Sequence, residues 1–392
     1  MSATHSIMTP RKQDRRQRRS PVLFALALFA FAPLLMFLSG CDTPGSHTNT
    51  ANTPETLSVQ QVRVHLASVT AISTSVRIAQ RHLYPFSQSN VGLMQPAVDA
   101  QGNIWVGEMH SNRLGRLNSH TGVVTSWEPP GARYGIMTTT IDAQGDVWFT
   151  EQNANYIGRF DPAHRTFRIF PLGNVNGSPL GPQDLRFDSR GLLWFTAATA
   201  GAIGRLDPTS GAIRTWLIPS PAPTIPSSPY SFTVTSAGRV WFGEFADGVI
   251  GTLDPRTGQV IFYDLPDPQT QVFSMATDSA GHLWFTEVLP GKLAMFDPAT
   301  DTLTELAVPA ASGKPPALYE LAIDHQGQIW FVDVGAGALV RYVPQQHSLT
   351  FFQLSLLSSA PFGLALDPAG NIWFTAGGSP ANYIGEMAPE GK

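Results

Sequence analysis

One phrase recurs along this 392-residue chain and constrains its fold more than any other feature. Each copy approximates the pattern Asp-x-x-Gly-x-apolar-Trp, as in "DAQGDVWFTE" and "DSAGHLWFTE". Successive copies lie 43 to 47 residues apart, and their tryptophans are Trp105, Trp148, Trp194, Trp241, Trp284, Trp330 and Trp373. A period of about 45 residues with a Trp-containing strand motif is typical of a β-propeller.

Each repeat carries the pattern of four short strands. In the second repeat we expect an inner strand at 136–141, a second strand at 146–151, a third at 156–160 and an outer strand at 166–172. Val, Ile, Phe and Trp favour strands, whereas Asp, Gly and Pro separate them. The strands are apolar on both faces, which is expected when neighbouring blades cover each blade on both sides.

The two ends of the repeat region complement each other. The last repeat ends after its third strand, and residues 80–90 ("QRHLYPFSQSN") resemble an outer strand placed before the first repeat. Pairing of these segments would close the ring and cover exposed sheet edges. The sequence therefore predicts an all-β fold over residues 75–392: a seven-bladed β-propeller of four-stranded blades, with the last blade closed by an N-terminal strand.

The N-terminus has the pattern of an export signal. Six Lys/Arg residues precede an apolar run at 21–38, which ends in "LSGC". This order predicts a signal peptide at residues 1–40, and "LSGC" resembles the lipobox of bacterial lipoproteins. Cys41 would then be lipidated and would anchor an exported protein to the cell membrane, on the periplasmic or the cell-surface side. The alternatives are a stray thiol, an uncleaved anchor or a twin-arginine signal.

The segment 41–74 is rich in Thr, Ser, Asn and Gln, and we expect a flexible tether there, with room for a short strand near "QQVRVHL". Cys41 is the single cysteine, so the exported chain has no disulfide. Residues 1–40 hold six of 25 basic and one of 29 acidic residues, so the remaining chain has a net charge of −9. That charge disfavours nucleic acid and anionic lipid as partners. We expect a monomer that meets the membrane through its lipid alone.

Strand direction predicts which side chains meet at one face, called here the top face. It is formed by the starts of the inner strands and the ends of the second strands. Eleven residues before each Trp, the expected ligand mouth contains Met94, Met137, Gln183, Tyr230, Phe273, Tyr319 and Phe362. An apolar, concave mouth with a few polar groups is the usual setting for a small-molecule or peptide ligand.

Acidic residues are expected around this mouth. They are Glu108, Glu151, Asp184, Glu244, Glu287, Glu320 and Asp333. One interpretation is a collar that holds a cation such as Mg²⁺ or Ca²⁺; the other is scaffolding, in which each carboxylate accepts N–H bonds from its own loop. His110 is the histidine expected on the top loops. No residue stands out as catalytic from the pattern alone.

The repeated phrases "WFTEQNANYIGRFDP" and "WFTAGGSPANYIGEM" resemble the virginiamycin B lyase (streptogramin B lyase) family over about residues 80–392. The resemblance implies a propeller that opens a cyclic depsipeptide by metal-assisted elimination at its ester. It also implies a histidine base and acidic residues on the top face of the last two blades, in the patterns Pro-His-x-Ile and Glu-Pro-His-Gly-Ile.

This chain departs from the family pattern at those positions. "PPALYELAI" places Tyr319 at one histidine, and "APFGLAL" places Phe362 at the other and Ala360 at the glutamate. A family acid after the last "WF" is replaced in the region of Ala376 and Gly377. Phenylalanine cannot accept a proton, and tyrosine, with an ordinary pKa near 10, would need strong activation.

Two functional hypotheses follow from these departures. The first is a tethered ligand-binding or scaffolding propeller at the cell envelope. The second is a divergent metal-dependent lyase or a lactonase-like hydrolase, with Glu320, Asp184, Glu108 and His110 as its candidate residues.

Overall fold

The computed structural model describes residues 58–388 except 69–71, 87–90, 132, 134, 222–225, 357–359 and 379–381. All described residues belong to one compact unit of the chain. This part is almost entirely β-strand, with two short 3₁₀ turns, η1 (Ala198–Ala200) and η2 (Pro344–Gln346). None of the described helices has the length and apolar character needed to span a membrane.

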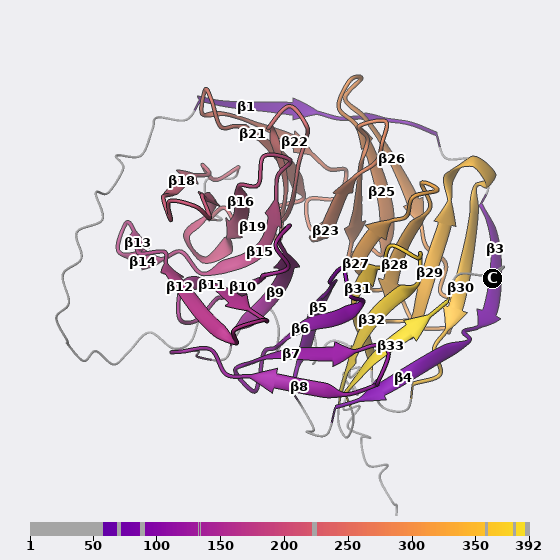
Figure 1. Cartoon of the computed structure of the whole chain (residues 1–392). Coiled ribbons are helices and arrows are strands. Elements are labelled where there is room, and N and C mark those ends of the chain that lie inside the picture. Colours follow the sequence, from indigo (N-terminus) through magenta and orange to yellow (C-terminus); the bar gives the residue numbers. More distant parts are fainter. Residues whose placement is uncertain are drawn as a thin grey trace, which may run out of the picture. The chain divides into compact units, whose positions relative to one another are not determined.

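The strands form a β-propeller, in which four-stranded antiparallel blades surround an axis (Figure 1). The innermost strands are β5 (Leu93–Val98), β9 (Ile136–Ile141), β15 (Pro182–Phe187), β19 (Pro229–Val234), β23 (Val272–Thr277), β27 (Leu318–Ile323) and β31 (Ala360–Leu366). The second strands are β6 (Asn103–Glu108), β10 (Val147–Glu151), β16 (Leu193–Ala197), β20 (Val240–Glu244), β24 (Leu283–Glu287), β28 (Ile329–Asp333) and β32 (Ile372–Gly377).

The outer half of each blade follows the same order. The third strands are β7 (Arg113–Asn118), β11 (Tyr156–Asp161), β17 (Ala202–Leu206), β21 (Val249–Asp254), β25 (Lys292–Asp297), β29 (Ala338–Val343) and β33 (Tyr383–Met387). The fourth strands are β8 (Val124–Trp127), β12 (Thr166–Pro171), β18 (Ile213–Leu217), β22 (Gln259–Asp264), β26 (Thr302–Ala307), β30 (Ser348–Gln353) and, from the N-terminal region, β4 (Arg81–Pro85). A small hairpin, β13 (Asn174–Val175) and β14 (Ser178–Pro179), lies in the connection between β12 and β15.

The Asp-x-x-Gly-x-apolar-Trp phrase is a local hydrogen-bonding unit. The Asp142 carboxylate accepts the backbone N–H groups of Gln144 at 3.0 Å and Asp146 at 2.9 Å, and the Nε1–H of Trp148 at 2.8 Å. Gly145 has a φ of 87°, which glycine adopts without strain. The phrase therefore fixes both the turn and the indole, and Asp99, Asp188, Asp278, Asp324 and Asp367 make the same indole bond.

Threonines in the second strands join one blade to the next. The pairing of inner and second strands shifts register near the top face, as between Val272 and Met275. The Thr286 hydroxyl accepts the freed Ser274 N–H at 3.2 Å and donates to the Tyr319 carbonyl of the following blade at 2.7 Å. Thr150 and Thr196 make the same pair of bonds, which position the axis-facing residues.

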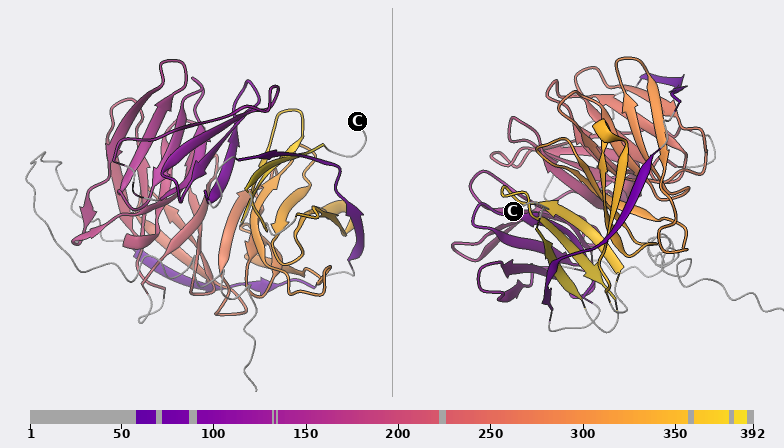
Figure 2. Two further views of the ribbon diagram at one scale, coloured as in Figure 1. Left: turned by 90° about the horizontal axis from the view of Figure 1, so that it is seen from below. Right: turned by 90° about the vertical axis from the view of Figure 1, so that its right-hand side faces the viewer.

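The N-terminal strands run along the outside of the sheets (Figure 2). β1 (Ser58–Arg63), β2 (His65–Leu66) and β3 (Ser73–Ile78) pair in parallel with β22, β26 and β30. The short strand allowed near "QQVRVHL" agrees with β1 and β2, whereas the expected flexible tether at 41–74 is wrong at residues 73–74, where β3 begins. Their backbone groups pair with outer edges that would otherwise be open. Cys41 and residues 41–57 lie outside the described residues.

The strand that follows completes the last blade. β4 pairs antiparallel with β33, from Arg81 opposite Met387 to Pro85 opposite Tyr383. This agrees with the expectation that a segment at 80–90 supplies the missing outer strand, although residues 87–90 lie outside the described part. The two ends of the repeat region thus share one sheet.

Candidate functional site

Aromatic side chains meet at the top of the axis. The ring of Phe273 lies 5.1 Å from that of Tyr230, 4.5 Å from that of Tyr319 and 5.7 Å from that of Phe362. Tyr319 and Phe362 also contact each other, at 5.3 Å between ring centres. We call these four residues the aromatic plug. Such tilted ring pairs add about 0.5–1.5 kcal/mol each beyond the burial of their surface.

The plug leaves little space beneath it. The cavity at this end of the axis measures about 30 Å³, which is room for about one water molecule. Of the residues expected at the mouth, the cavity is lined by Met94, Met137, Gln183, Tyr230, Phe273 and Phe362. Tyr319 does not line it and packs against Phe273 and Phe362. Small-molecule sites usually measure about 300–1,000 Å³. The expected open mouth is therefore a packed aromatic surface over a small chamber.

Two tiers of side chains face the axis below the plug. The upper tier contains Gln95, Thr138, Asp184, Ser231, Ser274, Glu320 and Gly363. The lower tier lies opposite the repeat tryptophans in the strand register and contains Ala97, Thr140, Arg186, Thr233, Ala276, Ala322 and Ala365. Arg186 is the single charged residue of the lower tier, and the small residues around it leave space for its guanidinium.

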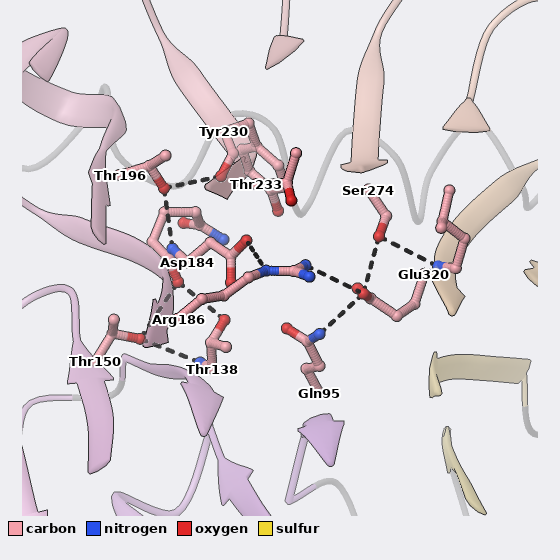
Figure 3. Close-up of polar contacts among 12 residues, drawn as sticks. Gln95, Thr138, Thr150, Asp184, Arg186, Thr196, Tyr230, Thr233, Ser274 and Glu320 are labelled. Carbon is pink, nitrogen blue, oxygen red and sulfur yellow. Dashed lines mark hydrogen bonds and ion pairs between the residues drawn. The ribbon is translucent and has the colours of Figure 1, made fainter. Parts of the chain in front are cut away.

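The Arg186 side chain crosses the axis between two carboxylates (Figure 3). Its Nε lies 3.4 Å from Asp184 Oδ2 on the same strand, and its Nη2 lies 3.9 Å from Glu320 Oε1 on β27. Glu320 Oε1 also accepts hydrogen bonds from Gln95 Nε2 and Ser274 Oγ, each at 2.8 Å. The resulting axial network joins four inner strands, β5, β15, β23 and β27.

Burial changes the protonation of the axial carboxyls. Burial raises the pKa of Glu320 to about 7 against the opposing attraction of Arg186, and the nearby Asp184 charge raises it further. Burial likewise raises the pKa of Asp184, which Arg186 also opposes. Near neutral pH, the axial network therefore exchanges a proton with solvent.

The remaining acids of the expected collar brace their own loops. The Glu151 carboxylate accepts the backbone N–H groups of Arg133, at 2.8 Å, and Ala154. Asp333 likewise accepts the backbone N–H groups of Ala317 and Ala336. Glu244 accepts the Ser227 hydroxyl and the Ser228 N–H, and Glu108 accepts the hydroxyls of Ser111 and of Ser126 on β8. Across the described part of the chain, no three His, Cys, Asp or Glu side chains form a group that could hold a metal ion.

Glu287 differs from its counterparts. Its carboxyl is fully buried and neither oxygen has a hydrogen-bond partner. Burial raises the pKa of Glu287 to about 8, the Glu305 charge raises it further, and Lys292 opposes this. Glu305 is itself held by Lys292 Nζ at 2.6 Å. Glu287 is therefore protonated in the folded protein at neutral pH.

His110 lies away from the axial chamber. Its ring is exposed and lies over Gly92, where an added Cβ would come within 2.8 Å of His110 Nδ1. Its backbone N–H donates to the Val91 carbonyl. His110 is thus not among the residues that line the small cavity.

Two features were missed from the sequence. The first is Arg186, which the sequence indicates by a charged residue at a position where the other repeats have Ala or Thr.

The second is a larger cavity of about 610 Å³ between the fifth and sixth repeats, on the side of the Asp-x-x-Gly turns. His282, His325, His347, Trp284 and Tyr342 contribute to its lining.

The fold and this site define a β-propeller whose polar axis is closed at the top by aromatic side chains. The model of the virginiamycin B lyase family matches residues 60–320, well over half of the chain. The chain therefore belongs to the virginiamycin B lyase family. No curated protein matches it.

Solved structures are similar to the chain in fold. A catalytically inactive virginiamycin B lyase from Staphylococcus aureus with quinupristin aligns at 24% identity and a TM-score of 0.69, covering 79% of this chain and 99% of that one. A streptogramin B lyase aligns at 23% identity and a TM-score of 0.67, covering 79% and 97%. YCF48 bound to D1 peptide aligns at 12% identity and a TM-score of 0.64, covering 83% and 100%.

The residues present do not fit the metal-assisted chemistry that the family resemblance implies. Tyr319 and Phe362, at the two histidine positions, pack against each other in the plug. Ala360 and Ala376 carry no oxygen ligand where acids are implied. The buried carboxyl of Glu320, which follows Tyr319 in the sequence, is held by Arg186, Ser274 and Gln95.

Glu287→Gln should change the pH dependence of stability. Because burial raises the folded-state pKa of Glu287 to about 8, the folded protein binds more protons than the unfolded chain between about pH 4.5 and 8. Its contribution therefore becomes less favourable as pH rises through that range. We expect the variant to gain about 2–4 kcal/mol relative to wild type between pH 5 and pH 9, measured by urea unfolding.

Glu128→Gln, which changes an exposed glutamate, is the matched control and should follow the wild-type profile. Parallel pH profiles for Glu287→Gln and wild type would contradict the assignment of a buried, protonated Glu287.

Proposed function

We propose that this chain is a seven-bladed propeller that binds a small molecule or peptide on its top face, as a ligand-binding or scaffolding protein of the cell envelope. Contacts between successive innermost strands, from β5 through β9, β15, β19, β23 and β27 to β31 and back to β5, support the count of seven. The propeller binds without catalysis and acts as a monomer, with no nucleic acid partner.

The aromatic plug carries this proposal. Rigid aromatic surfaces supply large contact area at low entropic cost, which suits recognition. Phe273 and Tyr319 keep 9% of their surface exposed, and Tyr230 and Phe362 keep more, so their rings form the floor of the top face. A ligand with apolar or aromatic groups would stack on this floor, and the loops braced by Glu151 and Glu244 would form its rim.

A divergent metal-dependent lyase or lactonase-like hydrolase is the alternative. It would need a base and a metal-binding carboxylate beside the ligand. Glu320 lines the same small cavity as Phe273 and Phe362, and its carboxyl is engaged by Arg186. No described group favours this chemistry. The test below distinguishes ligand binding from ring opening.

Quinupristin, the compound named with the staphylococcal lyase, is the first probe. We expect calorimetry to detect its binding and mass spectrometry to detect no ring opening, with or without Mg²⁺. Tyr319→Ala combined with Phe362→Ala should weaken binding at least about tenfold, because stacking area is lost from the centre of the surface. Tyr84→Ala, on the outer strand β4, is the control.

Binding that survives the double substitution would place the ligand elsewhere. Linear product formed by the wild-type protein would replace the binding proposal with the lyase alternative.

We further propose that Cys41 is lipidated after removal of residues 1–40, and that the lipid is the sole membrane attachment. Metabolic labelling with a tagged fatty acid should mark the wild-type protein and not Cys41→Ser. The variant should also leave the membrane fraction. Equal labelling of both proteins would contradict lipidation at Cys41.

A further inference from the structure

Two buried oxygen atoms in the axial chamber have no hydrogen-bond partner: Asp184 Oδ1 and Ser231 Oγ. The Asp184 side chain is 9% exposed and Ser231 is 3% exposed. Both residues line the cavity of about 30 Å³ under the plug. The N–H groups of Leu185 and Phe232 lie close enough to lower the pKa of Asp184, yet Oδ1 has no hydrogen bond of normal geometry. Since buried polar atoms normally have partners, these two indicate an occupant.

The charges around the chamber do not balance. Asp184 and Glu320 carry two carboxyl groups, and Arg186 supplies one positive charge. The other residues that face the axis are uncharged, namely Gln95, Thr138, Ser231, Ser274, Gly363, Ala97, Thr140, Thr233, Ala276, Ala322 and Ala365. One negative charge therefore stays uncompensated when both carboxyls are ionised, and burying such a charge is costly.

We propose that the axial chamber binds one monovalent cation, Na⁺ or K⁺, through Asp184 Oδ1 and Ser231 Oγ. Carboxylate and hydroxyl oxygens are the ligands that hard cations prefer. The volume admits one water-sized ion, and a single positive charge restores neutrality. A divalent ion is disfavoured because the Arg186 guanidinium already lies 3.4 Å from the same carboxylate.

The cation enters from the end of the axis opposite the plug. The Arg186 side chain is 31% exposed, and Ala97, Thr140, Ala276 and Ala365 of the lower tier are partly exposed. The proposed cation ligands, Asp184 and Ser231, are not members of the aromatic plug that carries the proposed function, although plug residues line the same cavity. The two proposals are therefore tested with different variants.

Thermal unfolding at fixed ionic strength tests the proposal, with NaCl or KCl replaced by choline chloride. We expect Na⁺ or K⁺ to raise the Tm of the wild-type protein saturably, by at least about 2 °C. Asp184→Asn should abolish this response. Arg186→Met should enlarge it, because removal of the guanidinium leaves a more negative site. Asp207→Asn, in an exposed turn, should respond like wild type.

Ser231→Ala keeps the Asp184 carboxylate and should weaken the Tm response to Na⁺ or K⁺ several-fold. This variant tests the proposal even if Asp184→Asn does not fold. Crystals soaked with Tl⁺ should show an anomalous peak between Asp184 and Ser231. Identical Tm values in Na⁺, K⁺ and choline, or a response retained in Asp184→Asn, would overturn the proposal. Stabilisation at low pH without any cation response would assign the occupant as a proton on the carboxyl pair.

Discussion

At the axis, the guanidinium of Arg186 lies between carboxyl groups that come from the third and the sixth repeat. Apolar blades can stack in a ring without it, but the axis would then hold two buried carboxyls, Asp184 and Glu320, facing each other without compensation. Removing one partner from such a buried pair is more costly than the pair is stabilising, because an unpaired charge remains. The small residues of the lower tier and the uncharged residues of the upper tier follow from the need to accommodate this network.

The aromatic plug and the axial network depend on each other. The plug limits solvent access from the top face, so the carboxyls beneath it lie in a poorly solvated setting that raises the pKa of Glu320 to about 7. In the same packing, Tyr319 and Phe362 stand at the positions where the family resemblance implies histidines. The family's fold is thus retained with different residues at these positions, and function resides in such sites rather than in the scaffold.

The repeat strands could be predicted closely because the residues that hydrogen-bond at each turn lie within the same repeated phrase. In the second repeat, the strands at 136–141 and 166–171 begin at the expected residues, since the Asp142 carboxylate and the Trp148 indole interact within one turn. The outer strands at 58–78 were not predicted as a set, because their partners lie more than 190 residues away and their residues are mostly exposed. The contact of Glu151 with its loop and the contact of Arg186 with Glu320 could not be predicted, because they depend on loop conformation and on closure of the ring.

A double-mutant cycle on Arg186→Met and Glu320→Gln tests the axial network most directly. Unfolding free energies are measured at pH 8, where both groups are mainly charged, for the wild type, the two single variants and the double variant. Our account predicts that the double variant is less destabilised than the sum of the singles by at least about 1 kcal/mol, since the second change relieves the unpaired charge left by the first. Additivity within about 0.5 kcal/mol would show that the two residues do not interact across the axis and would contradict the account.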